Sequence, residues 1–181
     1  MRPCPETVSP DAAEAALGFI LAHALREQAA GLGPATALLG LSGAELVALA
    51  ARWLPGADLT GIDPSDATRP APVRDVEQQA IELLVLWRAA GAGPEVRWLA
   101  AILARRSMES RHLWEDLGLP ARPALTQMIA RFLPGLAAAN ARNMRWKKFF
   151  ARQICSDAAF ALCPAPTCDA CDERQSCFAT D

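Results

Sequence analysis

Residues 44–56 of this 181-residue chain read AELVALAARWLPG, and residues 123–135 read PALTQMIARFLPG. The two stretches align without a gap, and Leu-Gly-Leu precedes each of them, at 39–41 and at 117–119. Each stretch ends in Pro-Gly, which stops a helix because proline cannot continue the hydrogen-bond ladder. We therefore predict two related helix–turn–helix units that pack on each other. Chance similarity in a chain rich in Ala and Leu is the alternative.

The rest of the sequence predicts an all-α fold. Apolar residues make up 52% of the chain and Tyr is absent, a composition that favours helices. Within the helix expected at about 74–90, we expect Ile81, Leu84 and Trp87 to face the core. We expect about six helices in total: one opened by Ser9-Pro10-Asp11 and ending near Gly31, one starting at the Ser42–Glu45 capping box, and four more at about 74–90, from Pro94 through Met108 to Trp114, at 123–132 and at 135–157.

The chain suits one helical domain with a small appendage. We place the domain at 1–157 and an irregular, cysteine-rich metal-binding tail, docked on the last helix, at 158–181. The N-terminus lacks a secretory-signal pattern, and no segment approaches the ~18 apolar residues of a membrane span. We therefore expect a cytoplasmic protein, in which thiols stay reduced. The net charge of −2 gives no bulk attraction to nucleic acid or to an anionic membrane.

Four cysteines near the C-terminus have the spacing C-x4-C-x2-C-x5-C: Cys163, Cys168, Cys171 and Cys177. In a reduced compartment this density favours metal ligation over disulfides. A single C-x-x-C, with ligands spread along one loop and no nearby His, suits an iron–sulfur cluster better than the paired turns of a zinc site. Zinc, disulfides and unrelated thiols are the alternatives. Cys155, eight residues upstream, is either an additional ligand or a packed thiol.

Residues 141–153, ARNMRWKKFFARQ, carry five cations and no acid: Arg142, Arg145, Lys147, Lys148 and Arg152. A solvated basic face is the ordinary interpretation of such a run. Beside an anionic cluster, the same cations would stabilise it, attract an anionic metal precursor or dock an acidic partner. Nucleic-acid binding is less supported, because the charge is confined to one segment.

Glu109 and His112 form one Glu-x-x-His pair, the spacing found in carboxylate-bridged di-iron bundles. Those bundles need two such pairs, and the only other histidine, His23, has no matching Glu. We interpret His112 as a capping or packed residue, with a role as an additional metal ligand as the alternative. No Ser/His/Asp arrangement, phosphate-binding glycine loop or general acid–base pair is present, so the sequence does not favour an enzyme.

The segments HLWEDLGL (112–119), RFLPGL (131–136) and NMRWKKFFARQIC (143–155), followed by the cysteine spacing and Phe178, resemble the NifQ family of nitrogen-fixation proteins. The resemblance is clear over about 112–178 and looser over the earlier unit. Ala151 and Ala179 depart from the residues expected at their positions, and neither change touches a thiol.

The resemblance implies a molybdenum carrier rather than an enzyme. It implies an iron–molybdenum–sulfur cluster on Cys163, Cys168, Cys171 and Cys177, and donation of molybdenum for the nitrogenase iron–molybdenum cofactor. The implied partners are cofactor-assembly proteins (the scaffold, the iron protein or both), with molybdate or a molybdenum-storage protein as the source. Neither nucleic acid nor membrane is an expected partner.

Two other classes remain as alternatives at this point. A zinc-stabilised helical binding module would use the same cysteines for structure alone. DNA glycosylases with a four-iron cluster have a similar cysteine spacing, and LPGLAAANA (133–141) is similar to their helix-hairpin-helix. Leu136-Ala137 stands where that hairpin needs its second glycine, and the chain is short for a base-flipping pocket. Metal content separates the three classes: molybdenum with iron, zinc, or iron alone.

Overall fold

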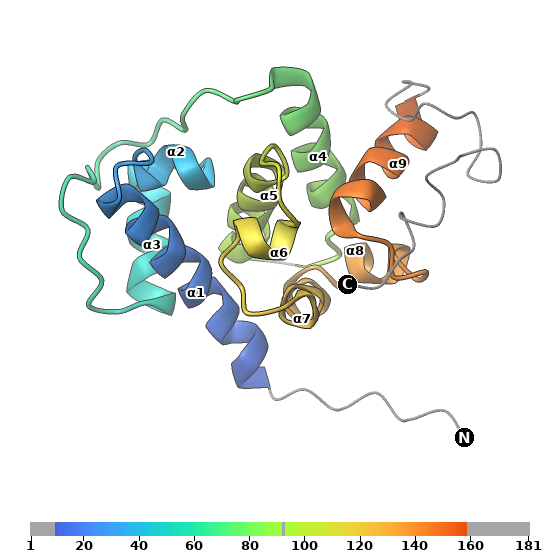
Figure 1. The fold of residues 1–181 in the computed structure, drawn as a ribbon, viewed down its shortest axis with the longest axis horizontal. Helices are drawn as coiled ribbons and strands as arrows, with labels where there is room; N and C mark the ends of the chain where they lie inside the picture. Colours follow the sequence, from blue (N-terminus) through green and yellow to red (C-terminus); the bar gives the residue numbers. More distant parts are fainter. Residues whose placement is uncertain (1–9, 92, 159–181) are drawn as a thin grey trace.

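The computed structural model describes residues 10–91 and 93–158, and these residues form nine α-helices and no β-strand (Figure 1). The predicted all-α class is thus confirmed for the described residues, with more and shorter helices than the six expected. Apart from Ala158, the predicted tail lies outside the described residues. The helices are α1 (Pro10–Ala29), α2 (Ala35–Leu39), α3 (Gly43–Trp53), α4 (Asp75–Arg88), α5 (Pro94–Arg106), α6 (Leu113–Asp116), α7 (Arg122–Phe132), α8 (Pro134–Ala139) and α9 (Trp146–Ala158).

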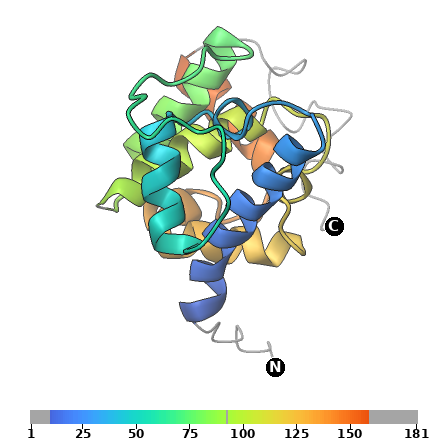
Figure 2. The same ribbon diagram turned by 90° about the vertical axis from the view of Figure 1, so that its left-hand side faces the viewer.

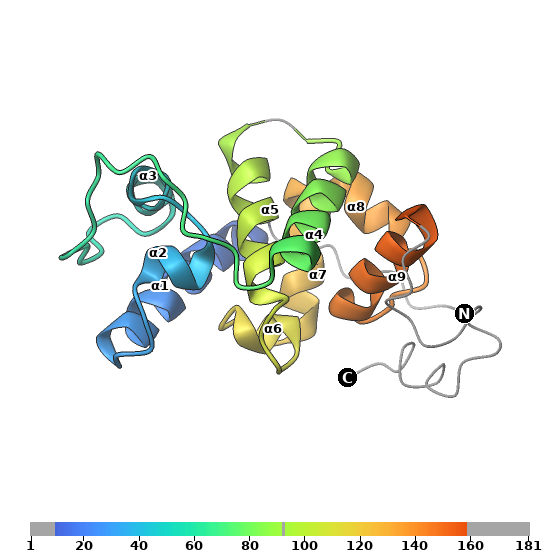
Figure 3. The ribbon, with the colours of Figure 1, turned by 90° about the horizontal axis from the view of Figure 1, so that it is seen from above.

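The helices are arranged from one end of the molecule to the other. Seen from above, α1, α2 and α3 lie at one end, α8 and α9 lie at the other, and α4 and α5 lie between them (Figure 3). The long loop that joins α3 to α4 runs over the outside of the first end (Figure 2). Among the described residues, no helix has the length and apolar character needed to cross a membrane.

Three predicted boundaries were wrong, each for a local reason. The short helix α2 has only five residues, too few to produce a visible helical period. The helix expected to run to Trp114 stops at Arg106 and is followed by α6, because the Ser107 hydroxyl donates to the Leu103 carbonyl (2.7 Å) at its end. The helix expected at 135–157 divides into α8 and α9 around Asn140, whose side chain bonds to the backbone of Met144.

The repeated sequence does form two similar units, α2–α3 and α6–α7. In each, the glycine of Leu-Gly-Leu ends a short helix in the left-handed conformation, with φ of 67° at both Gly40 and Gly118. The following leucine amide donates back to a carbonyl of the short helix, Leu41 to Thr36 (3.0 Å) and Leu119 to Trp114 (2.9 Å). This is the helix-ending geometry that glycine permits without a Cβ penalty.

The Pro-Gly ends of the two units also match, and they bring the units into contact. Trp53 and Phe132 occupy equivalent positions, and their rings pack edge to face at 5.7 Å. Beside each ring stands the preceding arginine, Arg52 at 5.2 Å from the Trp53 ring and Arg131 at 5.4 Å from the Phe132 ring. Such stacked pairs contribute to stability beyond the area that they bury.

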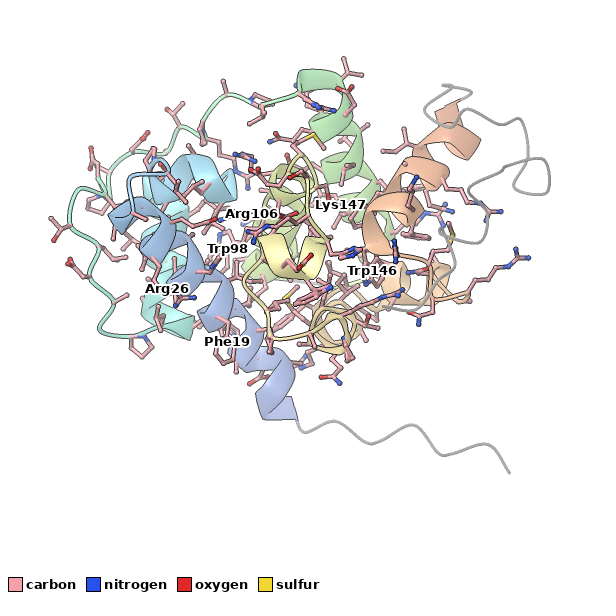
Figure 4. All side chains as sticks on the ribbon, viewed as in Figure 1. Phe19, Arg26, Trp98, Arg106, Trp146 and Lys147 are labelled. Carbon is pink, nitrogen blue, oxygen red and sulfur yellow. The ribbon has the colours of Figure 1, made fainter. Side chains whose placement is uncertain are left out.

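The two long helices that precede the units pack crosswise. Helix α1 packs against α7 of the second unit, and α5 packs against α2 of the first. His23 on α1 lies against Gly118, where a Cβ would approach the His23 Cγ to 2.3 Å, and Arg105 on α5 lies against Gly40. Between the helices, Arg106 is 2% exposed and donates to Glu27 at 2.5 Å (Figure 4). The packing therefore ties each unit to the helix of the other.

One predicted core residue faces outward. Ile81 and Leu84 of α4 are buried as expected, but Trp87 is 74% exposed. The Arg88 guanidinium stacks over its ring at 5.1 Å. At 100° per residue, Leu84 lies 60° from Ile81 around the helix and Trp87 lies a further 60° in the same direction. The core covers the side of Ile81 and Leu84, so Trp87, 120° from Ile81, lies beyond its edge.

Candidate functional site

The basic segment 141–153 does not form one continuous helix. The Asn140 amide donates to the Met144 carbonyl, and the Met144 amide donates to the Asn140 side chain, both at 2.9 Å. These bonds close a turn in which Asn143 takes a φ of 51°. Arg142 therefore lies exposed in the turn, and Arg145 lies immediately before α9. Only Lys147, Lys148 and Arg152 of the five predicted cations belong to the helix itself.

Lys147 joins the start of α9 to α6. Its ammonium donates to Asp116 Oδ2 at 2.6 Å and to the Glu109 carbonyl at 2.7 Å. The Asp116 side chain is only 3% exposed, and Arg111 stands 3.5 Å from its other oxygen. Because a buried carboxylate is costly without its cation, Lys147 has a packing role that the sequence did not reveal.

The aromatic residues of the segment form the base of this region. Trp146, Phe149 and Phe150 are buried, and their ring centroids lie 5.6–6.0 Å apart. The Trp146 indole nitrogen donates to the Thr126 hydroxyl of α7 at 3.4 Å. The cluster packs the first turn of α9 against α7. Trp146 and Lys147 both lie at this end of α9 (Figure 4).

His112 stands at the start of α6. Its backbone amide donates to the Glu115 carboxylate at 2.9 Å, and its carbonyl accepts from the Asp116 amide at 3.0 Å. These bonds give His112 the capping position that we expected. The side chain also lines a pocket beside α9. A role as a metal ligand stays a prediction.

The starts of α6, α7 and α9 surround a pocket of about 170 Å³. None of its ten described lining residues is acidic. Five of them are cationic, and Trp114, Trp146, Leu113, Leu125 and His112 complete the wall. The cations are Arg111, Arg122, Arg145, Lys147 and Lys148. The wall of this pocket therefore combines basic side chains with apolar and aromatic ones.

Arg122 is the residue of this pocket that sequence reasoning missed most clearly. It is buried, and its guanidinium donates to the Asn143 carbonyl at 2.6 Å and to the Asn143 side chain at 3.2 Å. One signal was available, because Arg122 opens α7 at the position where Gly43 opens α3 in the first unit. A charged residue in place of the glycine of a repeat is a difference between the two units that the sequence alone shows.

Two of the predicted cations lie away from the pocket wall. Arg142 is exposed in the turn before α9. Arg152, on the second half of α9, donates to the Met144 sulfur at 3.7 Å. The structure therefore divides the five predicted cations into three at the pocket, one in the turn and one further along α9.

The cysteine prediction falls almost wholly outside the described residues. Cys163, Cys168, Cys171 and Cys177 follow the last described residue, Ala158. Cys155 lies on α9, and its side chain is outside the description as well. Within residues 10–91 and 93–158, no three His, Cys, Asp or Glu side chains are grouped as metal ligands. The cysteine ligand set accordingly stays a prediction.

His23 and Glu27 form an ionisable group next to the second unit. His23 Nε2 lies 3.4 Å from Glu27, which Arg106 also contacts. Burial is the largest influence on His23 and lowers its pKa below the ordinary value of 6.5. Burial acts to raise the pKa of Glu27, but the hydrogen bond and charge of Arg106 outweigh it, so that pKa lies below 4.5.

The family model and the similar proteins found by comparison all belong to one family. The family model described as NifQ matches residues 16–179. The chain is 70% identical over 166 residues to "Protein NifQ" of Rhodobacter capsulatus, covering 92% of this chain and 89% of that protein. It is 40% identical over 163 residues to "Protein NifQ homolog" of Sinorhizobium fredii, covering 88% and 68% respectively. No solved structure matches the chain.

Proposed function

Since the chain belongs to the NifQ family of nitrogen-fixation proteins, we propose that it is a molybdenum carrier that donates the metal for the nitrogenase iron–molybdenum cofactor. The observation that carries the proposal is the cysteine motif C-x4-C-x2-C-x5-C, which follows α9 after the basic segment. Its thiolates would hold the cargo, an iron–sulfur cluster that contains molybdenum. The chain would act as a carrier and not as an enzyme.

The cysteines have the chemistry that this cargo needs. Thiolates are soft ligands that bind both iron and molybdenum in sulfur-rich clusters. Cys163, Cys168, Cys171 and Cys177 would supply the ligand set, with Cys155 as an additional candidate. Four thiolates on a cluster leave a net negative charge, which neighbouring cations offset.

The cations of the basic segment would then serve a second purpose. Lys147 is engaged with Asp116, so we assign partner docking to the exposed residues Arg142 and Lys148. The partners would be acidic surfaces of the cofactor-assembly proteins. Charges of this kind steer the encounter more than they set the final affinity.

The test is the metal content of protein purified without oxygen. We expect iron and molybdenum together in the parent, and a loss of most of both in Cys163→Ala, Cys168→Ala, Cys171→Ala and Cys177→Ala. Cys4→Ala is the matched control and should retain the metals. Zinc in the parent would instead indicate a structural metal module, and equal loss in the Cys4 control would show that the ligand set is drawn wrongly.

A further inference from the structure

Helix α4 is apolar on two opposite sides. Its inner side packs against α5, α8 and α9, and Ile81, Leu84 and Val85 are buried there. Val76 lies nine positions before Val85, which is half a turn around the helix at 100° per residue. The Val76 side chain is nevertheless 72% exposed. A helix that is apolar on both sides is normally covered on both sides.

The outer side of α4 holds most of the exposed apolar surface of the molecule. Seven large apolar side chains are exposed among the described residues, and five of them lie in α4 or just before it: Val73, Val76, Leu83, Leu86 and Trp87. Single exposed apolar residues are ordinary, but a contiguous patch of several hundred Å² marks a binding surface. Helix α4 lies at the upper edge of the molecule (Figure 1), where a partner can approach it.

Four residues form a seam along this outer side. They follow one another at intervals of four, three and four positions: Val76, Ala80, Leu83 and Trp87. At 100° per residue they all lie within about 60° around the helix. This is the spacing with which two helices interlock their side chains along a shared line of contact. The outer side of α4 therefore has the pattern of a helix that pairs with another helix.

The side chains of the seam are complementary to themselves in one orientation. In an antiparallel pair of two α4 helices, a single register sets Val76 of one copy against Trp87 of the second, and Ala80 against Leu83. Each layer then combines a smaller side chain with a larger one, which fills the space between facing helices. A parallel pair would instead set Trp87 against Trp87 and Ala80 against Ala80. The sizes thus favour the antiparallel pair.

The charges beside the seam agree with this orientation. Glu77 and Arg88 are eleven positions apart, so they lie within about 20° of each other around the helix, on the same flank of the seam. In the antiparallel pair, Glu77 of each copy approaches Arg88 of the other. The Arg88 guanidinium is held near the seam, because it stacks over the Trp87 ring at 5.1 Å. The positive start of each helix also lies beside the negative end of the other.

We propose that the outer side of α4 binds a second copy of this chain, in an antiparallel pair with two-fold symmetry. The contact is confined to a helix of 14 residues, about 21 Å long. Its total buried area therefore lies near or below roughly 1,200 Å², where reversible complexes are found. Among the described residues, none of α4 lines the pocket at the start of α9, so the two surfaces are separate.

The test is sedimentation velocity of the metal-free full chain, with a reducing agent present so that no disulfide links two chains. We expect a monomer near ~1 μM and a dimer toward ~500 μM, with a dissociation constant of roughly 1–100 μM. Leu83→Gln should weaken association at least about tenfold, because a symmetric dimer loses the contact twice. Its circular dichroism should match that of the parent, since Leu83 is exposed.

Leu32→Gln is the matched control. Leu32 lies in the turn after α1 and has the same exposed fraction as Leu83, 66%. This variant removes an equal apolar side chain from another part of the surface, so it should associate like the parent.

A mixing experiment tests the orientation. Val76→Glu and Trp87→Lys should each dimerise poorly, because each sets a charge against an apolar side chain in two layers. In an equimolar mixture of the two variants, an antiparallel pair keeps one native layer of Val76 and Trp87, and the two introduced charges meet in the other. The mixture should therefore dimerise more tightly than either variant alone. A parallel pair would bring the introduced charges no closer together.

Three outcomes would each overturn the proposal: a monomer at every concentration, equal weakening in Leu32→Gln, or no gain in the mixture. If the chain is monomeric throughout, limited proteolysis identifies another occupant. Faster cleavage within 159–181 in Leu83→Gln than in Leu32→Gln would then assign the outer side of α4 to that segment of the same chain.

Discussion

The two helix–turn–helix units share their turns but differ at the start of their second helix. In the first unit, Ser42 and Glu45 form a reciprocal capping box, with bonds of 3.2 and 3.0 Å, at the start of α3. The α3–α4 loop lies close above it, so that a Cβ on Gly43 would stand 2.0 Å from the Asp63 carbonyl oxygen. In the second unit, Ala121 provides no side-chain cap and Arg122 occupies the equivalent of Gly43.

The difference lies in how each unit covers the start of its second helix. The first unit satisfies its helix start internally and covers it with a loop that carries Asp63 and Asp66. The second leaves the corresponding start uncapped by side chains and adds cations from α9. The turns and the Trp53–Phe132 contact belong to the part that is shared. The candidate pocket lies where the copies differ.

The largest effect that would test this comparison is the replacement of the two turn glycines. Gly118→Ala should lower the free energy of unfolding by about 3 kcal/mol or more, because left-handed strain of ~1–2 kcal/mol adds to the clash with His23. Gly40→Ala has the same strain, but its Cβ would lie 3.2 Å from Arg105 Cβ, so we expect about 1–2 kcal/mol. Urea denaturation measures both. Equal losses would show that α1 gives way at His23 and that the crosswise packing is looser than described.

A smaller effect on stability should distinguish Lys147 from Lys148, the two lysines at the start of α9. Lys147→Glu should lower stability by about 2–4 kcal/mol, since it strands Asp116 and places a second carboxylate beside it. Lys148→Glu should change stability by less than ~0.5 kcal/mol, because the residue is exposed. If Lys148 also docks partners, this variant should slow molybdenum transfer to the cofactor-assembly proteins at low salt. Normal transfer would remove Lys148 from the docking surface, and equal stability of the two variants would contradict the role of Lys147.

The smallest expected effect is a difference in pH response. His23, which packs on the second unit, has a pKa below 6.5 in the folded state because burial favours its neutral form over the charged one. The unfolded chain therefore binds more protons just below pH 6.5, and stability should fall as the pH drops from there until the folded pKa is passed. Glu27, Arg106, Arg26 and Arg111 act on the same imidazole.

The first unit should respond only in more acidic solution. Burial acts to raise the pKa of Glu45, but the hydrogen bond from Arg69 outweighs it and holds the pKa below 4.5. Its contribution is therefore lost only as the pH falls below 4.5 and through the folded pKa. Urea midpoints between pH 8 and 5 test the difference, with His23→Gln expected to flatten the curve. An unchanged slope in that variant would assign the pH response to other groups.

Local signals in the sequence predicted much of the fold. The Leu-Gly-Leu and Pro-Gly motifs correctly predicted the turns, and the capping box of Ser42 and Glu45 correctly predicted the start of α3. The breaks at Ser107 and Asn140 were not predicted, because each depends on one side chain competing for backbone bonds within an otherwise helical pattern. Trp87 was predicted to face the core because it continues the helical spacing of Ile81 and Leu84. Spacing alone does not show how far around the helix the core extends.

The candidate site was predictable only in part. The cations of 141–153 were visible as a run, but Arg111, Trp114 and Arg122 join them from two other segments that only the fold brings together. The ion pair of Lys147 with the buried Asp116 is likewise a tertiary contact across 31 positions. The assignment of the four cysteines remains a prediction from their spacing and from the family.

The indoles of Trp114 and Trp146 in the pocket wall have an optical consequence. The chain has five tryptophans and no tyrosine, so its ultraviolet emission comes almost wholly from indole. Two of the five emitters border the pocket, whereas Trp87 stands in solvent. A charged group that occupies the pocket would change the electric field at these two indoles. The protein thus carries a built-in, label-free reporter for the occupancy of this pocket.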